Sequence, residues 1–200
     1  KTISHYCFFI KNKNNRKMEK SNLKPFLREN LDILFVGLNP AKGSSDNGHY
    51  FSVNQAFWNQ LFNSGLITHH VDKMVADDLV FGDNKYNLNN LNYGITDLIT
   101  EFAESDSKKI KPTINDVKRL ISLIEVNQPK ITIILHSKVL TNLFTYLRKE
   151  KPSSNQGFLG KVLPDSNTLF YAIAFPHGNN ICSDEKIKNY KLIKQELITK

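Results

Sequence analysis

Few side chains in this sequence have the type and the spacing that metal chemistry requires. His69 and His70 look like a metal-binding pair, but no third ligand stands at a useful spacing from them. The two cysteines, Cys7 and Cys182, cannot supply the four thiolates of an iron–sulfur cluster. We therefore expect the protein to work without a metal ion and without any other cofactor.

Polar side chains that could act without a metal stand in two loops. The first loop, residues 37–53, contains Asn39, whose amide offers both a hydrogen-bond donor and an acceptor. The second loop, residues 175–182, contains His177, whose imidazole can donate a hydrogen bond in its neutral form. Taken alone, Asn39-Pro40 is typical of a turn that ends a strand, and a single loop histidine is often structural. Their meaning depends on the elements that position them.

Strand and helix patterns alternate along the chain. Short apolar and β-branched runs predict strands, whereas apolar residues spaced three and four apart predict helices. The predicted strands are 32–36, 131–135 and 169–174, and the predicted helices are 54–64, 114–125, 138–149 and 184–197. Thr113 and Ser183 are the expected N-caps of the second and the last of these helices. The alternation predicts a three-layer α/β/α fold around a central, mostly parallel sheet of about four strands.

In open sheets of this kind, ligands bind beyond the carboxyl ends of the strands. Three loops are expected there, namely 37–53, 92–97 and 175–182. Asn39 and His177 would then meet at the same edge of the sheet. The stretches near 43–48 and 152–160, which contain Gly and Ser, are expected to be loops.

The length of 200 residues suits one domain with its own core. Residues 1–24 are expected to be a basic N-terminal extension and 25–200 the domain; because Met18 could be a start, residues 1–17 are expected to carry no function. No apolar run approaches the roughly 20 residues of a membrane-spanning helix. We recognise no targeting segment, and two cysteines are too few for a secreted disulfide scaffold. We expect a cytoplasmic monomer that does not interact with membranes.

The net charge of +8 is unevenly spread. Residues 1–30 hold eight Lys/Arg against two acids, whereas residues 66–107 hold two Lys against eight Asp/Glu. Such asymmetry suits a protein with one face toward a polyanion, because neutralised phosphates release counterions. An ordinary solvated surface explains the same balance equally well.

Segments in and after the first loop follow one another in a specific order. Gly37-Leu38-Asn39-Pro40 is followed by the aromatic stretch Gly48-His49-Tyr50-Phe51 and then by a helix with Phe57-Trp58. This order resembles the mismatch-specific uracil/thymine branch of the uracil-DNA glycosylase superfamily, whose first motif is Gly-hydrophobic-Asn-Pro-Gly. Ala41 stands where that branch usually has the final glycine. The segment Tyr93 to Leu98 is similar to the family's Gly-hydrophobic-Thr-Asp-Leu stretch.

The second loop matches the same family in part. The family carries either Asn-Pro-Ser-Gly-Leu or His-Pro-Ser-Pro-Leu at this place. His177 matches the second form, whereas Gly178 and Asn179 replace the Pro and the Ser that follow it. The chain thus combines an Asn-type first motif with a His-type second motif, within a likeness that covers residues 30–198.

The resemblance implies a DNA glycosylase of base-excision repair, which extrudes a nucleotide from the duplex and hydrolyses its N-glycosyl bond. The implied substrate is uracil in DNA, and mismatched or damaged pyrimidines could be further substrates. Breaking the bond from C1′ to N1 needs a positioned water and donors at the oxygen of the departing base. By this resemblance Asn39 positions the water, and His177 donates to uracil O2.

The resemblance also implies binding roles. Leu38, Tyr50 and Phe51 are expected to hold the extruded base, with either aromatic ring as its stacking partner or as part of the core. Ile181 is expected to fill the gap that the base leaves in the stack. The residues expected to contact DNA are Lys42, Asn179, Asn180 and Ile181.

Two residues close to these motifs, Trp58 and Asp97, are expected to have other roles. Trp58, the single tryptophan, lies in an apolar helical stripe and is expected to be a core residue. Asp97 could cap a turn or orient the pocket, and both roles remain open.

Competing functions remain open at this point. A binding module that keeps the fold but has lost the reaction would explain the altered second loop, and an enzyme of free nucleosides or nucleotides could use the same pocket. Lys42 could serve as the amine of a lyase mechanism, but nothing in the sequence indicates the burial that would lower its pKa. We therefore expect a monofunctional glycosylase.

Overall fold

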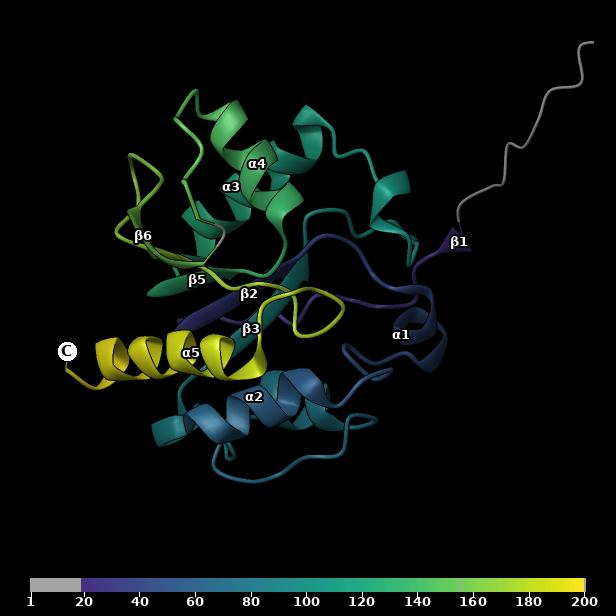
Figure 1. Ribbon diagram of the computed structural model, residues 1–200, viewed down its shortest axis with the longest axis vertical. Coiled ribbons are helices and arrows are strands. Elements are labelled where there is room, and N and C mark those ends of the chain that lie inside the picture. Colours follow the sequence, from purple (N-terminus) through teal and green to yellow (C-terminus); the bar gives the residue numbers. More distant parts are fainter. Residues whose placement is uncertain (1–18, 155, 200) are drawn as a thin grey trace, which may run out of the picture.

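A five-stranded sheet forms the middle layer of the molecule (Figure 1), in a computed structural model that describes residues 19–154 and 156–199. The expectations for residues 1–17 lie outside the described residues. The sheet has the order β3-β2-β5-β7-β6. Its strands are β2 (Ile33–Gly37), β3 (Tyr93–Asp97), β5 (Ile131–Ile134), β6 (Gly157–Lys161) and β7 (Leu169–Ala172). Strands β3, β2, β5 and β7 pair with their neighbours in parallel, whereas β6 pairs antiparallel with β7. The prediction of a mostly parallel sheet is therefore confirmed.

Strand β3 lies where the sequence predicts a loop at 92–97, and that prediction is wrong. All five of its residues are buried, and β3 pairs in parallel with β2 from Ile33↔Tyr93 to Gly37↔Asp97. Glycine and polar residues interrupt its apolar pattern, which hides the strand in the sequence. Gly94 is required by close packing, because a Cβ there would stand 2.7 Å from the backbone oxygen of Phe26.

Strand β6 corrects a second prediction, because the sequence analysis expects a loop at 152–160. Its side chains are mostly exposed or half-buried, with Phe158 59% exposed, so no alternation of apolar and polar residues marks it. The pairing with β7 is irregular between Phe158 and Gly160. This antiparallel edge strand brings the sheet to five strands, against the expected number of about four.

Helices cover both faces of the sheet (Figure 1). On one face α2 (Ala56–Ser64) packs against α5 (Ser183–Ile198), and on the other α3 (Ile114–Asn127) lies beside α4 (Ser137–Tyr146). A short helix, α1 (Lys42–Asn47), lies within the first loop. The smaller elements are β1 (Glu19–Lys20), β4 (Phe102–Ala103) and the helical turns η1 (Asp78–Gly82), η2 (Leu88–Asn90) and η3 (Ser107–Lys109). No described helix has the length and hydrophobicity that crossing a membrane would demand.

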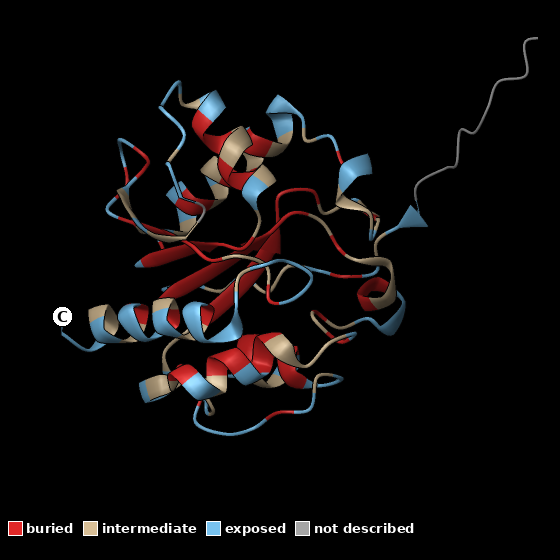
Figure 2. Ribbon diagram, viewed as in Figure 1, coloured by how far each residue is buried: buried red, intermediate tan, exposed pale blue. Residues whose placement is uncertain are grey.

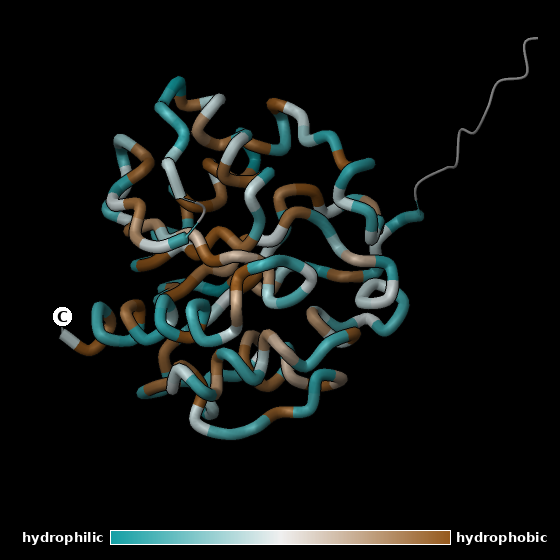
Figure 3. The backbone as a smooth tube through the Cα atoms, in the orientation of Figure 1, coloured by the Kyte–Doolittle hydropathy of each residue, from teal (hydrophilic) through white to brown (hydrophobic). Residues whose placement is uncertain are grey.

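The core has two halves because successive strand residues point to opposite faces. Ile33 and Phe35 join the apolar cluster on the side of α2 and α5, whereas Leu34 and Val36 join the cluster on the side of α3 and α4. Figure 2 shows the parallel strands buried over almost their whole length, and Figure 3 shows them as the apolar centre of the chain. Trp58 is 1% exposed and belongs to the first cluster, as expected.

The structure confirms one of the two predicted helix N-caps and contradicts the other. Thr113 caps α3 and forms a capping box with Asp116, as predicted. Ser183, by contrast, is the first residue of α5, and its N-cap is Cys182. The Ser183 hydroxyl instead accepts a hydrogen bond from Gln60 Nε2 at 3.3 Å, so a contact between two helices takes the place of a cap.

The segment 19–24, which the sequence assigns to the extension, packs against the domain. β1 pairs antiparallel with β4, and the backbone N–H of Asn22 donates to the Ser45 hydroxyl at 2.9 Å. Leu23 is 6% exposed and lies in the core. Strand pairing and burial thus tie this segment to the rest of the fold.

Candidate active site

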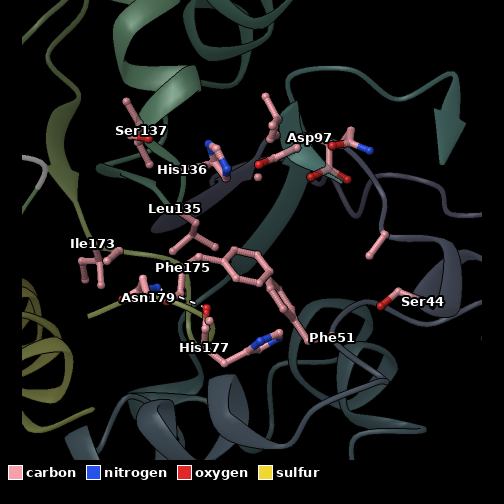
Figure 4. A pocket seen from close by; sticks show the side chains of 18 of the residues that line it. Ser44, Phe51, Asp97, Leu135, His136, Ser137, Ile173, Phe175, His177 and Asn179 are labelled. Atoms are coloured by element: carbon pink, nitrogen blue, oxygen red, sulfur yellow. Dashed lines mark hydrogen bonds between the residues drawn. The ribbon is translucent and has the colours of Figure 1, made fainter. Parts of the chain in front are cut away.

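A pocket of about 890 Å³ lies at the carboxyl ends of the parallel strands. The first loop, the ends of β3 and β5, and the second loop line it (Figure 4). This is the edge at which open α/β sheets bind ligands. The pocket brings together Asn39 and His177, which the sequence places at a common edge.

Asn39 follows β2, and its side chain is held in one orientation. Its Nδ2 group donates to the backbone oxygens of Pro40 at 2.9 Å and Glu104 at 2.8 Å. Both amide hydrogens are therefore used within the protein, and the amide oxygen Oδ1 is the atom that the side chain can still offer. An acceptor held in this way can orient a water molecule but cannot take its proton.

The tip of the first loop is anchored by Asp77, which is 1% exposed. One oxygen of Asp77 lies 2.8 Å from His49 Nδ1 and accepts from the Asp78 N–H, and the other accepts from the Tyr50 N–H at 2.7 Å. Gly48 ends α1 in the left-handed conformation and turns the chain toward this anchor. The buried carboxylate thereby fixes the backbone just before Phe51.

Phe51 and Tyr50 occupy different environments in the pocket wall. Phe51 is half-buried and has a φ of 54°, an unusual value for an aromatic residue. Its ring stacks on Phe57, with centroids 4.0 Å apart and planes at 23°, and lies 6.0 Å from Phe175. Tyr50 is only 4% exposed, and burial raises the pKa of its hydroxyl well above the usual range. Phe51 is thus the more accessible of the two expected stacking rings.

Asp97, at the end of β3, places a carboxyl group in the same pocket. The residue is 5% exposed, and its buried Oδ2 has no hydrogen-bond partner among the described residues. Gly37 makes room for it, because a Cβ at position 37 would stand 2.1 Å from Asp97 Oδ1. Burial raises the pKa of Asp97 to about 7, against the opposing charge of Arg119.

The second loop is exposed and is bonded mainly to itself. Asn179 donates to the backbone oxygens of Phe175 at 2.7 Å and His177 at 3.2 Å, and its Oδ1 accepts from the Ile181 N–H. The loop is tied to the core at the Pro176 carbonyl, which accepts from Gln60 of α2 at 3.0 Å and from Lys186 of α5 at 3.2 Å.

His177 and His136 bring two imidazoles to the pocket. His177 is exposed, and its ring lies 5.1 Å from that of Phe175. Desolvation, followed by the charge of Lys186, lowers the pKa of His177, so the ring is mostly neutral at pH 7. His136, the N-cap of α4, was not singled out in the sequence; its Nδ1 accepts from the Lys138 N–H at 3.1 Å. In the neutral ring Nε2 then carries the proton, and desolvation lowers the pKa of His136 as well.

The remaining predicted residues are spread around this edge. Leu38 is buried and lines the pocket, and half-buried Ile181 lines it from the second loop. Asn180 is exposed outside the lining. Lys42 also lies outside it; its ammonium pairs with Glu19 at 3.6 Å, and its backbone N–H donates to Ser105 Oγ. The structure therefore does not bring Lys42 into the pocket.

One cluster has the atoms of a metal site. His49, Asp77 and Asp78 each offer a ligand atom, and these atoms lie within 4.8 Å of one another. Both oxygens of Asp77 already accept N–H groups, so the cluster fits a structural role in the first loop. His69 and His70 pack on different rings, those of Tyr86 and Phe62, and do not converge on one ligand.

The family model described as "Uracil DNA glycosylase superfamily" matches residues 24–196. This match covers most of the chain and includes every segment that lines the pocket except Leu23. Among curated proteins, no match to this chain was found.

Proposed function

The chain belongs to the uracil DNA glycosylase superfamily, and we propose that it removes uracil from DNA by hydrolysing the N-glycosyl bond of an extruded nucleotide. Membership supports a DNA glycosylase type of function and DNA as the partner. The observation that carries the more specific proposal is the fixed amide of Asn39 in a pocket that also contains the ring of Phe51.

In this proposal Asn39 Oδ1 accepts a hydrogen bond from a water molecule and holds it near C1′. The bond between C1′ and N1 breaks, and its electron pair leaves with the base as an anion. The water oxygen bonds to C1′ of the cation-like sugar and releases one proton, which passes through solvent water to the departing base anion. A base stacked on Phe51 is held in place for this step. The neutral ring of His177 donates a hydrogen bond to O2 of the departing base, where negative charge develops.

The proposed enzyme is monofunctional. A lyase would need an amine within reach of C1′, whereas the Lys42 ammonium lies outside the pocket lining and pairs with Glu19. We therefore expect that borohydride will not trap a covalent adduct between the protein and uracil-containing DNA. A trapped adduct would contradict this part of the proposal.

The second loop is proposed to meet DNA beside the extruded nucleotide, with Ile181 entering the base stack. Asn180 and Lys42 are exposed or partly exposed and can contact phosphates, whereas the Asn179 side chain is engaged within the loop. We also propose specificity for mismatched bases, because the first motif, Gly37-Leu38-Asn39-Pro40, resembles that of the mismatch-specific branch. The protein is proposed to act as a cytoplasmic monomer.

The decisive experiment compares the wild type with Asn39→Ala on oligonucleotides that carry uracil, mismatched thymine or hypoxanthine. Excision is read on gels after alkaline cleavage, and DNA affinity is measured separately. We expect Asn39→Ala to lower the excision rate by about 100-fold or more, on the scale of losing one positioned transition-state group. Asn59→Ala, at an exposed position of α2 outside the pocket, is the matched control.

Affinity separates the possible outcomes. Loss of excision with affinity retained supports the role of Asn39 in the reaction. Excision that survives Asn39→Ala would show that this amide does not position the water. A wild-type protein that binds DNA without excising any of these bases would instead be a binding member of the fold.

A further inference from the structure

Residues 19–23, which we call the N-terminal strap, lie beside the first loop and precede the residues that match the family model. Figure 1 shows β1, the first part of the strap, on the same side of the molecule as α1. At the other end of the strap, Leu23 is buried and lines the pocket. The strap therefore contributes to the pocket although it lies outside the family match.

The strap holds β4 by backbone pairing. The two residues of β1 pair antiparallel with the two residues of β4, and the Ser21 N–H donates to the Glu101 oxygen at 3.1 Å. β1 and β4 form a two-stranded sheet of their own, apart from the central sheet. The backbone of β4 is thus paired with the strap rather than with the five-stranded sheet.

The residue after β4 holds the amide of Asn39. The Glu104 oxygen accepts from Asn39 Nδ2 at 2.8 Å, and the Glu104 N–H donates to the Pro40 oxygen at 3.0 Å. Glu104 directly follows Ala103, the last residue of β4. A displacement of β4 would therefore move one of the two carbonyls that orient the Asn39 amide.

The strap also reaches α1 in the first loop. The backbone N–H of Asn22 donates to the hydroxyl of Ser45, a buried residue of α1, at 2.9 Å. The next N–H, that of Leu23, donates to Ser21 Oγ at 3.1 Å, and the Leu23 side chain packs in the core. One segment thereby joins α1, which follows Asn39 in the chain, to β4, which leads to Glu104.

We propose that the N-terminal strap is a positioning element of the active site, which acts through β4 and Glu104 to fix the Asn39 amide with Oδ1 free to hold the reacting water. This inference rests on the proposed function, because it takes Asn39 as the residue that positions the water. A group that is already in place needs no reorganisation when the reaction occurs. The excision rate, rather than the affinity for DNA, should therefore depend on the strap.

The test measures single-turnover excision of uracil by the full chain carrying either Ser21→Pro or Ser21→Ala. Both variants lose the hydroxyl, but proline alone also lacks the N–H that donates to Glu101. We expect Ser21→Pro to excise about tenfold more slowly than Ser21→Ala, because small misplacements of a positioned group are costly. The two variants should bind DNA equally well.

A second comparison places both substitutions in an Asn39→Ala background. With the amide gone, Ser21→Pro should be no slower than Ser21→Ala, since the strap acts through that amide. A loss of similar size in this background would show that the strap acts on excision by another route, and it would overturn the inference.

Hydrogen exchange tests the strap without relying on excision. The Glu104 N–H, which donates to the Pro40 oxygen, should exchange about tenfold or more faster in Ser21→Pro than in Ser21→Ala. The Leu135 N–H, which donates to the oxygen of Val36 in β2, is the reference and should exchange equally in both variants.

The outcomes separate the inference from the proposed function. Equal excision and equal Glu104 exchange in the two variants, or an equal acceleration of Leu135, overturn the inference while leaving the proposed function intact. If the wild type excises no base, the proposed function fails, and Glu104 exchange alone decides whether the strap holds the partner of Asn39. If Ser21→Pro does not fold, Ser45→Ala, which removes the acceptor at the other end of the strap, is compared with the wild type by the same measurements.

Discussion

The two sides of the pocket are built differently. On the β2–β3 side, formed by residues 37–53 and 97–107, hydrogen bonds join segments far apart in the chain, such as Asn39 to Glu104 and Asp77 to Tyr50. On the β7 side, formed by residues 175–182, Asn179 bonds within its own loop, and the Pro176 carbonyl is the tie to the helices. Figure 2 shows this loop largely exposed and Figure 3 shows it largely hydrophilic.

This difference suggests a division of work. A reaction that depends on the position of one water benefits from groups that are already held in place, as on the β2–β3 side. A surface that must fit a distorted DNA strand benefits from a loop with few ties to the core, as on the β7 side. Substitutions on the two sides should accordingly differ in size and in kind.

The largest expected difference concerns the charge of Asp97. Burial raises its pKa from the ordinary 3.8 to about 7, so between these values the folded protein keeps a proton that the unfolded chain has released. The stability from the neutral group is full below pH 3.8 and is lost as the pH rises to about 7, for a total of up to about 4 kcal/mol. Asp97→Asn should therefore gain stability over the wild type between pH 5 and pH 8, as measured by urea unfolding. A constant difference between the two proteins would contradict this.

Glycine substitutions compare the packing of the two sides. In Gly37→Ala the new Cβ would meet Asp97 Oδ1 at 2.1 Å, and such overpacking costs about 1–3 kcal/mol. Gly178→Ala has open space around its Cβ and a φ of 71°, so backbone strain of about 1 kcal/mol is its whole expected cost. Midpoints of denaturant unfolding test the order, and equal losses would remove the contrast.

A third comparison replaces one anchor on each side. Asp77→Asn puts an N–H donor where a carboxylate oxygen now accepts a backbone or ring N–H, and an unsatisfied buried group costs about 1–3 kcal/mol. Uracil excision should fall with it, because the backbone before Phe51 loses its support. Asn179→Ala removes bonds that water can replace in an exposed loop, so its stability should change by less than about 1 kcal/mol while DNA affinity weakens. Thermal unfolding and DNA titration of both variants measure these effects.

The sequence predicts the regular parts of the fold well and the irregular parts poorly. The apolar runs of β2, β5 and β7 and the capping box of α3 are local signals, and they agree with the structure. β3 and β6 carry weak local signals, since glycine and polar residues interrupt the first and solvent covers much of the second. Ser183 looks like an N-cap because its residue type favours that position, but its hydroxyl contacts Gln60 of another helix.

The same division holds for the site. The sequence by itself determined the family likeness, the layered fold and the candidates Asn39, Phe51 and His177, because motif spacing and strand order place these residues at one edge of the sheet. Tertiary structure alone decided that the Asn39 amide hydrogens are taken by Pro40 and Glu104 and that Lys42 lies outside the pocket. It also decided that the carboxyl oxygen Oδ2 of Asp97 is buried without a hydrogen-bond partner among the described residues, since burial and pairing depend on neighbours brought together only by folding.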